Sequence, residues 1–213
     1  MRNRNTTAKM IKFFKNFKHY IQTKIYNACV NIAKEREEKN QRSIFSAMSF
    51  HGTPLVVGEG YYIRGSRYME FGDNCMFGKN CWVECIDTYQ GQRFSPRLSI
   101  GRNFSMQQNC HIGCIDSVEI GDNVLLGSKI YITDHYHGEI TKEALALPPI
   151  SRPLWGKPVK IGNNVWIGDN VSIMPGVAIG DNVIVGANAV VTHSFPDSVV
   201  IAGVPARIIR KLV

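Results

Sequence analysis

Hydrophobic residues recur at every sixth position in the C-terminal half of the chain. Six aliphatic residues share this spacing: Ile161, Ile167, Ile173, Ile179, Val185 and Val191. A second apolar or small residue follows each of the first five by four positions: Val165, Val171, Val177, Val183 and Ala189. An α-helix repeats near 3.6 residues and an extended strand near two, so neither produces this pattern. The chain must therefore turn after each short strand.

Glycine, asparagine and aspartate fill the positions that follow the leading aliphatic residues. The same unit occurs earlier in the chain, in imperfect copies at 71–75, 77–81, 100–104 and 120–124. Asn and Gly suit corners because they tolerate left-handed backbone angles. Three short strands with three corners close a triangular coil, and stacked coils bury their leading residues along one axis. The pattern predicts one all-β solenoid from about residue 55 to 205.

The repeats resemble the hexapeptide-repeat acyltransferases, in the branch of maltose, galactoside and bacterial polysaccharide O-acetyltransferases. Four segments carry the resemblance: 120–127 (IGDNVLLG), 133–138 (TDHYHG), 157–168 (KPVKIGNNVWIG) and 200–210 (VIAGVPARIIR). It covers roughly residues 55 to 211. It implies a left-handed parallel β-helix, although the general rule for parallel crossovers favours the right hand. It also implies a homotrimer that uses acetyl-CoA.

The sixfold pattern stops after Ile132 and resumes at Ile161, which predicts a long loop excursion at about 133–158. Long loops on a regular scaffold are commonly functional. His135 and His137 lie at its start, and the resemblance implies that a histidine of this loop is the general base. Transfer of acetyl to a hydroxyl requires removal of the alcohol proton, and imidazole is suited to accept it at neutral pH.

The sequence slightly favours His135 over His137 as this base, because the Asp-His motif aligns His135 naturally. The number of residues that separate the histidine from Gly121 favours His137 instead, because relatives with one catalytic histidine in this loop often have the longer of the two separations. Asp134 is interpreted as a solvated loop acid because adjacent side chains often point apart. Orientation of the imidazole by Asp134 is the alternative.

The resemblance implies that the C-terminal coils bind acetyl-CoA. It places Trp166 near the reacting centre, Asp169 and Ala187 along the pantetheine arm, and Thr192 and His193 at the middle of CoA. The family commonly has Ser in place of Asp169 and Lys in place of His193. Two further residues, Arg207 and Arg210, would meet the phosphates, because anionic groups require cationic partners. Core or interface packing is the alternative for Trp166, and a solvated C-terminal segment for the arginines.

On the acceptor side, the family uses an amide side chain near the reacting centre. Gln107 occupies the position of that amide when residues are counted without a gap, and Asn109 matches it in chemistry, so both are candidates. Corner asparagines are plentiful in this chain, which makes a purely structural role equally plausible.

The 213-residue chain has 44% apolar and 20% charged residues, which is typical of a globular protein. Its net charge of +8 lies entirely in residues 1–43, where 11 basic residues face three acidic ones, while 14 basic and 14 acidic residues balance in the remainder. This neutral body argues against nucleic-acid binding. We therefore divide the chain into a basic segment, 1–43, and a hexapeptide-repeat acyltransferase domain, 44–213.

Apolar residues in the basic segment recur at helical spacing, which predicts one or two amphipathic helices. Such a helix can lie on an anionic membrane surface. The favoured interpretation is instead that its Phe-rich stripe caps the open end of the solenoid or packs on another subunit.

The six cysteines form no C-x-x-C pair, and the repeat places Cys75, Cys81 and Cys110 at inward positions, where Cys is a small hydrophobe. We expect reduced cysteines and no metal site. A carbonic anhydrase, another β-helix relative, would need three metal-binding histidines per site.

The resulting hypothesis is an O-acetyltransferase that moves acetyl from acetyl-CoA to a sugar hydroxyl, in a surface polysaccharide or its precursor. The alternatives are N-acetylation of an amino sugar, O-acetylation of an antibiotic, and a non-catalytic β-helix scaffold. No apolar stretch approaches the ~20 residues of a membrane span, and the N-terminus lacks the pattern of a secretory signal. The expected location is cytoplasmic, with peripheral contact at the inner membrane surface left open.

Overall fold

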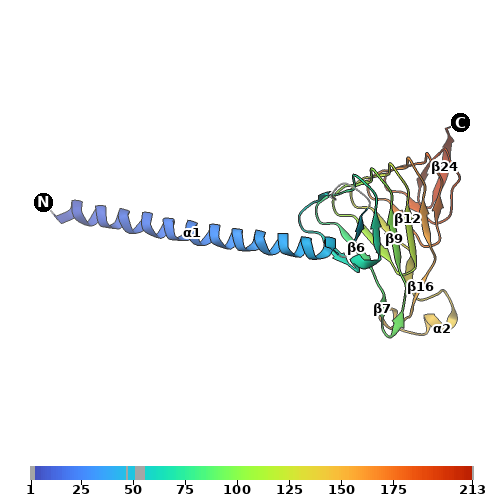
Figure 1. Cartoon of the computed structure of the whole chain (residues 1–213), viewed down its shortest axis with the longest axis horizontal. Helices are drawn as coiled ribbons and strands as arrows, with labels where there is room; N and C mark the ends of the chain where they lie inside the picture. Colours follow the sequence, from blue (N-terminus) through green and yellow to red (C-terminus); the bar gives the residue numbers. More distant parts are fainter. Residues whose placement is uncertain (1–2, 47, 51–55, 213) are drawn as a thin grey trace. The chain divides into compact units, whose positions relative to one another are not determined.

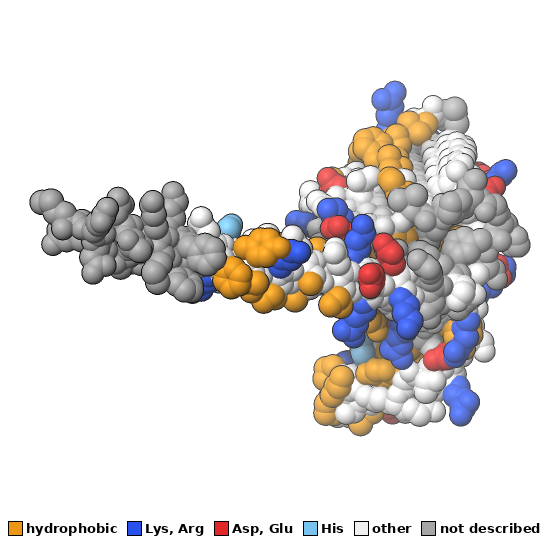
Figure 2. All heavy atoms as spheres, turned by 60° about the vertical axis from the view of Figure 1, so that its left-hand side comes forward, with side chains coloured by type: hydrophobic (Ala, Val, Ile, Leu, Met, Phe, Trp, Pro, Cys, Tyr) orange, Lys and Arg blue, Asp and Glu red, His pale blue; other side chains and the backbone are white. Residues whose placement is uncertain are grey.

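The computed structural model describes residues 3–46, 48–50 and 56–212 and divides the chain into two compact units, Met1–Ser46 and Ala47–Val213. The first unit holds helix α1 (Asn3–Ser46), a single helix where the sequence predicted one or two. The side chains described between residues 15 and 36 are exposed, among them Phe17, Ile25 and Tyr26 at 53%, 59% and 68%. Figure 2 shows hydrophobic and basic side chains together along the described part of this helix.

Three sheets form the faces of the second unit (Figure 1). Sheet A contains β1 (Ser49–Phe50), β4 (Met69–Phe71), β9 (Arg97–Ile100), β12 (Ser117–Ile120), β17 (Val159–Ile161) and β20 (Ala178–Ile179). Sheet B contains β2 (Val56–Val57), β5 (Met76–Phe77), β10 (Ser105–Met106), β13 (Leu125–Leu126), β18 (Trp166–Ile167), β21 (Ile184–Val185), β23 (Val199–Gly203) and β24 (Ala206–Lys211). Sheet C contains β3 (Tyr62–Arg64), β6 (Trp82–Cys85), β11 (His111–Cys114), β14 (Tyr131–Thr133), β19 (Ser172–Ile173) and β22 (Val190–Val191).

The chain visits sheets A, B and C in turn, and each coil up to β22 adds one parallel strand to each sheet. Only β24 runs antiparallel within these three sheets, as it returns along β23. The leading aliphatic residues of the repeat, from Ile161 to Val191, are 0–2% exposed, and the residues four positions after them are equally buried. The predicted all-β solenoid, a left-handed parallel β-helix, is confirmed.

Corners join the sheets, and we name them A/B, B/C and C/A after the sheets they connect. Nine asparagines have positive φ angles between 54° and 60°, as expected for residues that turn the chain without a steric penalty. They are Asn74, Asn80, Asn103, Asn109, Asn123, Asn164, Asn170, Asn182 and Asn188.

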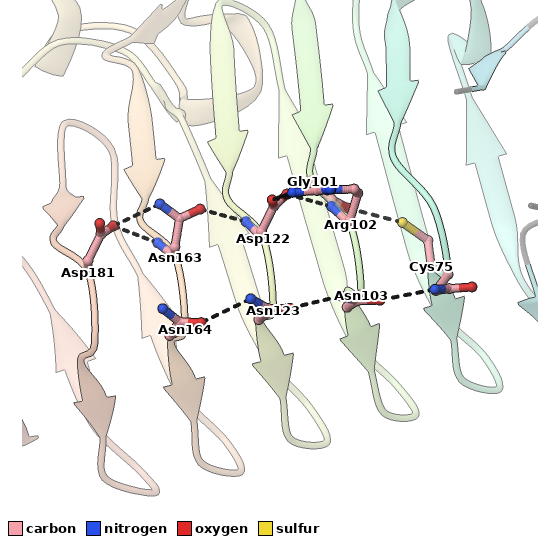
Figure 3. A network of polar contacts seen from close by, with 10 residues as sticks. Cys75, Gly101, Arg102, Asn103, Asp122, Asn123, Asn163, Asn164 and Asp181 are labelled. Atoms are coloured by element: carbon pink, nitrogen blue, oxygen red, sulfur yellow. Dashed lines mark hydrogen bonds and ion pairs between the residues drawn. The ribbon is translucent and has the colours of Figure 1, made fainter. Parts of the chain in front are cut away.

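At the A/B corner, side-chain oxygens link each coil to the one before it (Figure 3). Oδ1 of Asp122 accepts the backbone N–H of Arg102 at 2.7 Å, Asn163 accepts that of Asp122 at 2.9 Å, and Asp181 accepts that of Asn163 at 2.7 Å. The Arg102 guanidinium also bonds the Asp122 carboxylate and holds its pKa below the usual range. These corner residues hold neighbouring coils in register.

Two excursions leave the coil at the C/A corner, and Figure 1 shows them at the same edge of the solenoid. The longer one falls between Thr133 and Val159, as predicted, and contains β15 (His135–His137), α2 (Lys142–Leu145), η2 (Pro149–Ser151) and β16 (Leu154–Gly156). The shorter one is a hairpin of β7 (Thr88–Tyr89) and β8 (Gln92–Arg93), which the sequence analysis did not predict. A 3-10 turn, η1 (Ser66–Tyr68), precedes β4 at this corner one coil earlier.

Cys75, Cys81 and Cys110 are buried at 1–2% exposure, as the repeat predicted, and all six cysteines are free. Burial raises the pKa of the Cys75 thiol to about 11, which keeps it protonated at neutral pH. Among the described residues, no three His, Cys, Asp or Glu side chains gather as a metal site would require. No helix in the described ranges is long and apolar enough to cross a membrane.

Candidate active site

The two excursions pack against each other and build one structure at the C/A corner. The Gln92 side chain bonds the backbone of Leu154 twice, accepting its N–H at 2.8 Å and donating to its carbonyl at 3.3 Å. Ile86, Ile115 and Leu154 form a small buried cluster beneath them. β15 pairs antiparallel with β16, so His135 and His137 lie on a strand and not in a free loop.

His135 sits against a buried carboxylate. Its Nδ1 lies 2.9 Å from Oδ1 of Asp134 and 3.1 Å from Oγ1 of Thr133. The His135 side chain is 13% exposed, whereas the Asp134 side chain is fully buried. The interpretation of Asp134 as a solvated acid is therefore wrong, and the alternative, orientation of the imidazole, agrees with this geometry.

Backbone donors fix the Asp134 carboxylate. The N–H of Ile115 reaches both carboxylate oxygens at 2.9 and 3.0 Å, and the N–H of Asp116 donates to Oδ2 at 2.8 Å. These bonds stabilise negative charge in a buried position. The backbone that donates belongs to the preceding coil, close to twenty residues earlier in the sequence, so adjacency in the chain gave no signal of the contact.

The contacts of Nδ1 determine which nitrogen of His135 can act as a base. A carboxylate only accepts hydrogen bonds, so the hydrogen-bond network assigns the proton of the neutral ring to Nδ1. Nε2 then carries the free lone pair. Among the described residues, none makes a hydrogen bond to this Nε2. The ring can therefore accept a proton from a molecule bound beside it.

Gly113 makes room for the His135 ring. A Cβ atom at this position would lie 3.2 Å from Cε1 of His135 and 3.7 Å from Nε2 of His111. Nε2 of His111 in turn lies 3.4 Å from Oε1 of Glu84, which is buried at 9% residue exposure. Burial of Glu84 favours its neutral form, but the contact with His111 and the charge of Arg64 outweigh this and lower its pKa. The sequence analysis missed Gly113, His111 and Glu84, although strand alternation could have placed all three on the outward face of sheet C.

His137 occupies a different environment. Its Nδ1 lies 3.4 Å from the Tyr89 hydroxyl of the short hairpin, with ring centroids 5.6 Å apart, and the residue is exposed. Among the described residues, no carboxylate pairs with this ring as Asp134 does with His135. The geometry supports His135 over His137 as a base held in one orientation.

The residues predicted to bind the donor do not converge within one chain. Trp166 lies on sheet B and is 52% exposed, so it is not a core residue. Asp169 and Ala187 lie at the B/C corner, where Oδ1 of Asp169 accepts the N–H of Ser128 at 2.6 Å. Thr192 and His193 follow β22 at the C/A corner, with Oγ1 and Nδ1 3.4 Å apart.

The two arginines lie on β24, the outermost strand of sheet B. Arg207 Nη1 donates to the carbonyl of Ala206 at 2.7 Å, and Arg210 is exposed opposite Val200. The candidate acceptor residues, Gln107 and Asn109, are exposed at the B/C corner, one corner away from the excursions. Neither of these amides therefore lies at the same coil corner as His135.

Comparison with known proteins places the chain among transferases with six-residue repeats. The family model described as "Bacterial transferase hexapeptide (six repeats)" matches residues 158–193. The chain is 36% identical over 174 residues to WbbJ of Escherichia coli K12, assigned as a lipopolysaccharide biosynthesis O-acetyl transferase, with 80% of this chain and 85% of that protein covered. It is 41% identical over 138 residues to the galactoside O-acetyltransferase of the same organism, with 63% of each covered.

Solved structures show the same fold. The maltose O-acetyltransferase from Clostridium difficile 630 is 28% identical, with a TM-score of 0.54 over 83% of this chain and 76% of that one. The Vibrio cholerae acetyltransferase VCA0836, solved with acetyl coenzyme A, gives a TM-score of 0.54 at 23% identity, over 83% of this chain and 78% of that one.

Proposed function

The chain belongs to the hexapeptide-repeat acyltransferase family and is an acetyltransferase, and from this membership we propose that it transfers acetyl from acetyl-CoA to a sugar hydroxyl. The observation that carries the reaction is the Asp134–His135 pair, with Nδ1 held at 2.9 Å and Nε2 free. A sugar acceptor in a surface polysaccharide or its precursor agrees with the names of the lipopolysaccharide and galactoside relatives.

In the proposed mechanism, Nε2 of His135 removes the proton of the acceptor hydroxyl as its oxygen bonds to the thioester carbonyl carbon. Asp134 stabilises the imidazolium that forms and keeps the ring in place. The carbon–sulfur bond then breaks, and Nε2 returns the proton to the departing CoA sulfur. The products are an acetyl ester and free CoA, with no covalent intermediate on the enzyme.

We further propose that the donor site forms between two copies of the chain in a homotrimer. Trp166, Asp169 and Ala187 lie on sheet B and the B/C corner, whereas His135, Thr192 and His193 lie at the C/A corner. A groove between neighbouring solenoids would bring the first set of one copy to the second set of another. Arg207 and Arg210 on β24 would then meet the anionic end of CoA.

Turnover of acetyl-CoA over a panel of mono- and oligosaccharides tests the proposal. Release of the CoA thiol, together with a product that gains one acetyl group and loses it in alkaline hydroxylamine, indicates O-acetylation. A hydroxylamine-stable product would indicate an amino sugar acceptor, and modification of an antibiotic alone would indicate that alternative class. Absence of turnover with every acceptor would favour a non-catalytic scaffold.

We propose that the enzyme is cytoplasmic and that α1 contacts the anionic inner membrane surface, which is the alternative to the capping role favoured from the sequence. Exposed apolar and basic side chains on one helix support this location, because each Lys near such a surface contributes about 1 kcal/mol. A triple variant with Lys15, Lys18 and Lys24 replaced by Gln should lose binding to phosphatidylserine vesicles. Equal binding by the parent and the triple variant would contradict the membrane role.

A further inference from the structure

The three sheets of the solenoid present three chemically different outward surfaces. In register along sheet A, the outward residues are Glu70, Ser99, Glu119 and Lys160. Along sheet B they are Met76, Ser105, Leu125, Trp166, Ile184 and Val200. Along sheet C they are Tyr62, Trp82, His111 and Tyr131, which we call the aromatic row, followed by Ser172 and Val190. The sheets thus present one polar and charged surface, one mainly aliphatic surface and one aromatic surface.

The rings of the aromatic row touch one another in a continuous line. Ring centroids are 5.1 Å apart for Tyr62 and Trp82, 4.8 Å for Trp82 and His111, and 5.3 Å for His111 and Tyr131. Tyr62, Trp82 and Tyr131 are 49%, 45% and 38% exposed. The row therefore offers a continuous apolar surface with hydroxyl and ring N–H groups along it.

A polar row runs beside the aromatic row, two residues further along the same strands. Arg64, Glu84 and Gly113 are aligned in register there. The Glu84 carboxylate is buried at 9% exposure, and its lowered pKa keeps it charged at neutral pH. The Glu84 carboxylate, the Arg64 guanidinium and the open space at Gly113 thus lie beside the rings.

The proposed general base lies beside the third member of the aromatic row. His111 is its third member, and the position of a Cβ on Gly113 is 3.7 Å from His111 Nε2 and 3.2 Å from His135 Cε1. The two imidazoles therefore flank the same glycine. A molecule lying along the row would pass beside His135 where it crosses His111.

From this juxtaposition we propose that the aromatic row is the acceptor platform, which binds an oligosaccharide along sheet C with its reacting hydroxyl at His135. The proposal rests on the proposed function. The apolar C–H faces of pyranose rings stack on aromatic side chains, while hydroxyls at the ring edge bond Glu84, Arg64 and His111. Tyr62 to Tyr131 spans three strand spacings, about 14 Å, which suits several sugar units better than one.

A second copy of the chain fits this surface less well than a sugar does. An apolar protein surface packed over the row would bury the Glu84 charge further without supplying a new donor, which is costly. Sugar hydroxyls supply such donors. The surface of sheet B is the better candidate for contact between copies, since Met76, Leu125 and Trp166 are 42%, 44% and 52% exposed and carry no charge.

The test measures binding of the full chain to bacterial capsular and O-antigen oligosaccharides, graded in length from mono- to hexasaccharide. Affinity should rise with length for at least one series. Trp82→Ala should weaken binding of the long members by about 10-fold or more, and Trp82→Phe should retain most of it. Tyr62→Ala should affect only the longest members. Lys160→Ala, exposed on the polar surface of sheet A and away from both the aromatic row and sheet B, is the control and should bind like the parent.

Three results would overturn the platform: affinity independent of length or absent throughout the panel, unchanged binding by Trp82→Ala, or a change of molar mass by light scattering in Trp82→Ala alone. The last would show that another copy covers the row. Acetyl transfer by the parent to the single-sugar acceptors reports on the proposed function separately: parental turnover of monosaccharides without any gain in affinity with length would keep the function and overturn the platform alone.

Discussion

At the A/B corner, the side chains of Asp122, Asn163 and Asp181 each accept a backbone N–H from the preceding coil, and all of them are partly or fully exposed. At the C/A corner, Asp134 also accepts backbone N–H groups from the preceding coil, but it is fully buried and also contacts His135.

The difference between the two corners lies in what surrounds the same polar contact. At the A/B corner, the accepting side chains are open to solvent and their contacts join neighbouring coils. At the C/A corner, Asp134 is fully buried, and its Oδ1 also contacts the imidazole of His135. The same kind of contact that joins coils at the A/B corner thus also orients the imidazole of His135 at the C/A corner.

The largest expected effect follows removal of the base. His135→Ala should lower turnover by about 100-fold or more while acetyl-CoA binding stays nearly intact, because general bases typically contribute this much. Steady-state kinetics and a binding titration measure the two quantities. His137→Ala is the matched control and should retain most activity. If His137→Ala lost the activity instead, the base would be His137.

The next effect contrasts aspartates at the two corners. Asp134→Asn should lower turnover by about 10-fold or more, because the amide removes the charge that stabilises the imidazolium and can disturb the tautomer. Asp181→Asn keeps an oxygen acceptor at the A/B corner and should leave turnover within about twofold. Equal loss in the two variants would mean that the carboxylates act only through stability.

A smaller effect should follow filling of the gap beneath the imidazole. In Gly113→Ala, the new Cβ would lie 3.2 Å from His135 Cε1, so the ring must shift by a few tenths of an ångström. Turnover should fall by about 10-fold, since misplaced reacting groups lose rate steeply. Thermal melting serves as the control. A parental rate at an unchanged melting temperature would remove Gly113 from the positioning of His135.

The donor arginines should affect affinity more than turnover. Arg207→Ala and Arg210→Ala should each raise KM for acetyl-CoA by roughly 3- to 10-fold with kcat little changed, because charge-assisted contacts hold phosphates and weaken with salt. Lys160→Ala removes an exposed cation from sheet A and controls for the general effect of losing one positive charge. An unchanged KM in both arginine variants would place the phosphates elsewhere.

The smallest effect concerns acid stability. The pKa of Glu84 is lowered in the folded chain, so its charge contributes stability above the usual glutamate range, and this stability is lost as pH falls through the folded pKa. Glu84→Gln should therefore show a smaller drop in melting temperature between pH 7 and about pH 3 than the parent does, because the loss begins near the unfolded glutamate pKa of about 4.3 and continues down to the lower folded pKa. An equal drop in the two proteins would contradict the assignment.

The coils could be predicted from sequence because their signal is local. The leading aliphatic residues of the repeat, such as Ile167 and Val185, recur at a fixed spacing and are buried as expected. The boundaries of the long excursion followed from the same signal. The hairpin at 88–93 was missed, although Gln90 and Gly91 both adopt positive φ and form the kind of turn that joins two strands.

The site was less predictable because its contacts cross coils. Asp134 bonds Ile115 and Asp116, and Gly113 touches His135, over separations of about twenty residues that no local pattern encodes. Asp134 was interpreted as a solvated acid because adjacent side chains often point apart, and its burial in the fold contradicts that interpretation. The donor residues lie on different sheets and corners of one chain, and under the proposed arrangement they would meet only between two copies.

Chemical rescue with imidazole tests most directly whether the ring held by Asp134 is the base. In His135→Ala, added imidazole can enter the space between Gly113 and Asp134 and accept the acceptor's proton. The account predicts that turnover of this variant rises with imidazole and saturates, whereas His137→Ala and Asp181→Asn do not respond. Parental turnover of His135→Ala without imidazole, or rescue confined to His137→Ala, would contradict it.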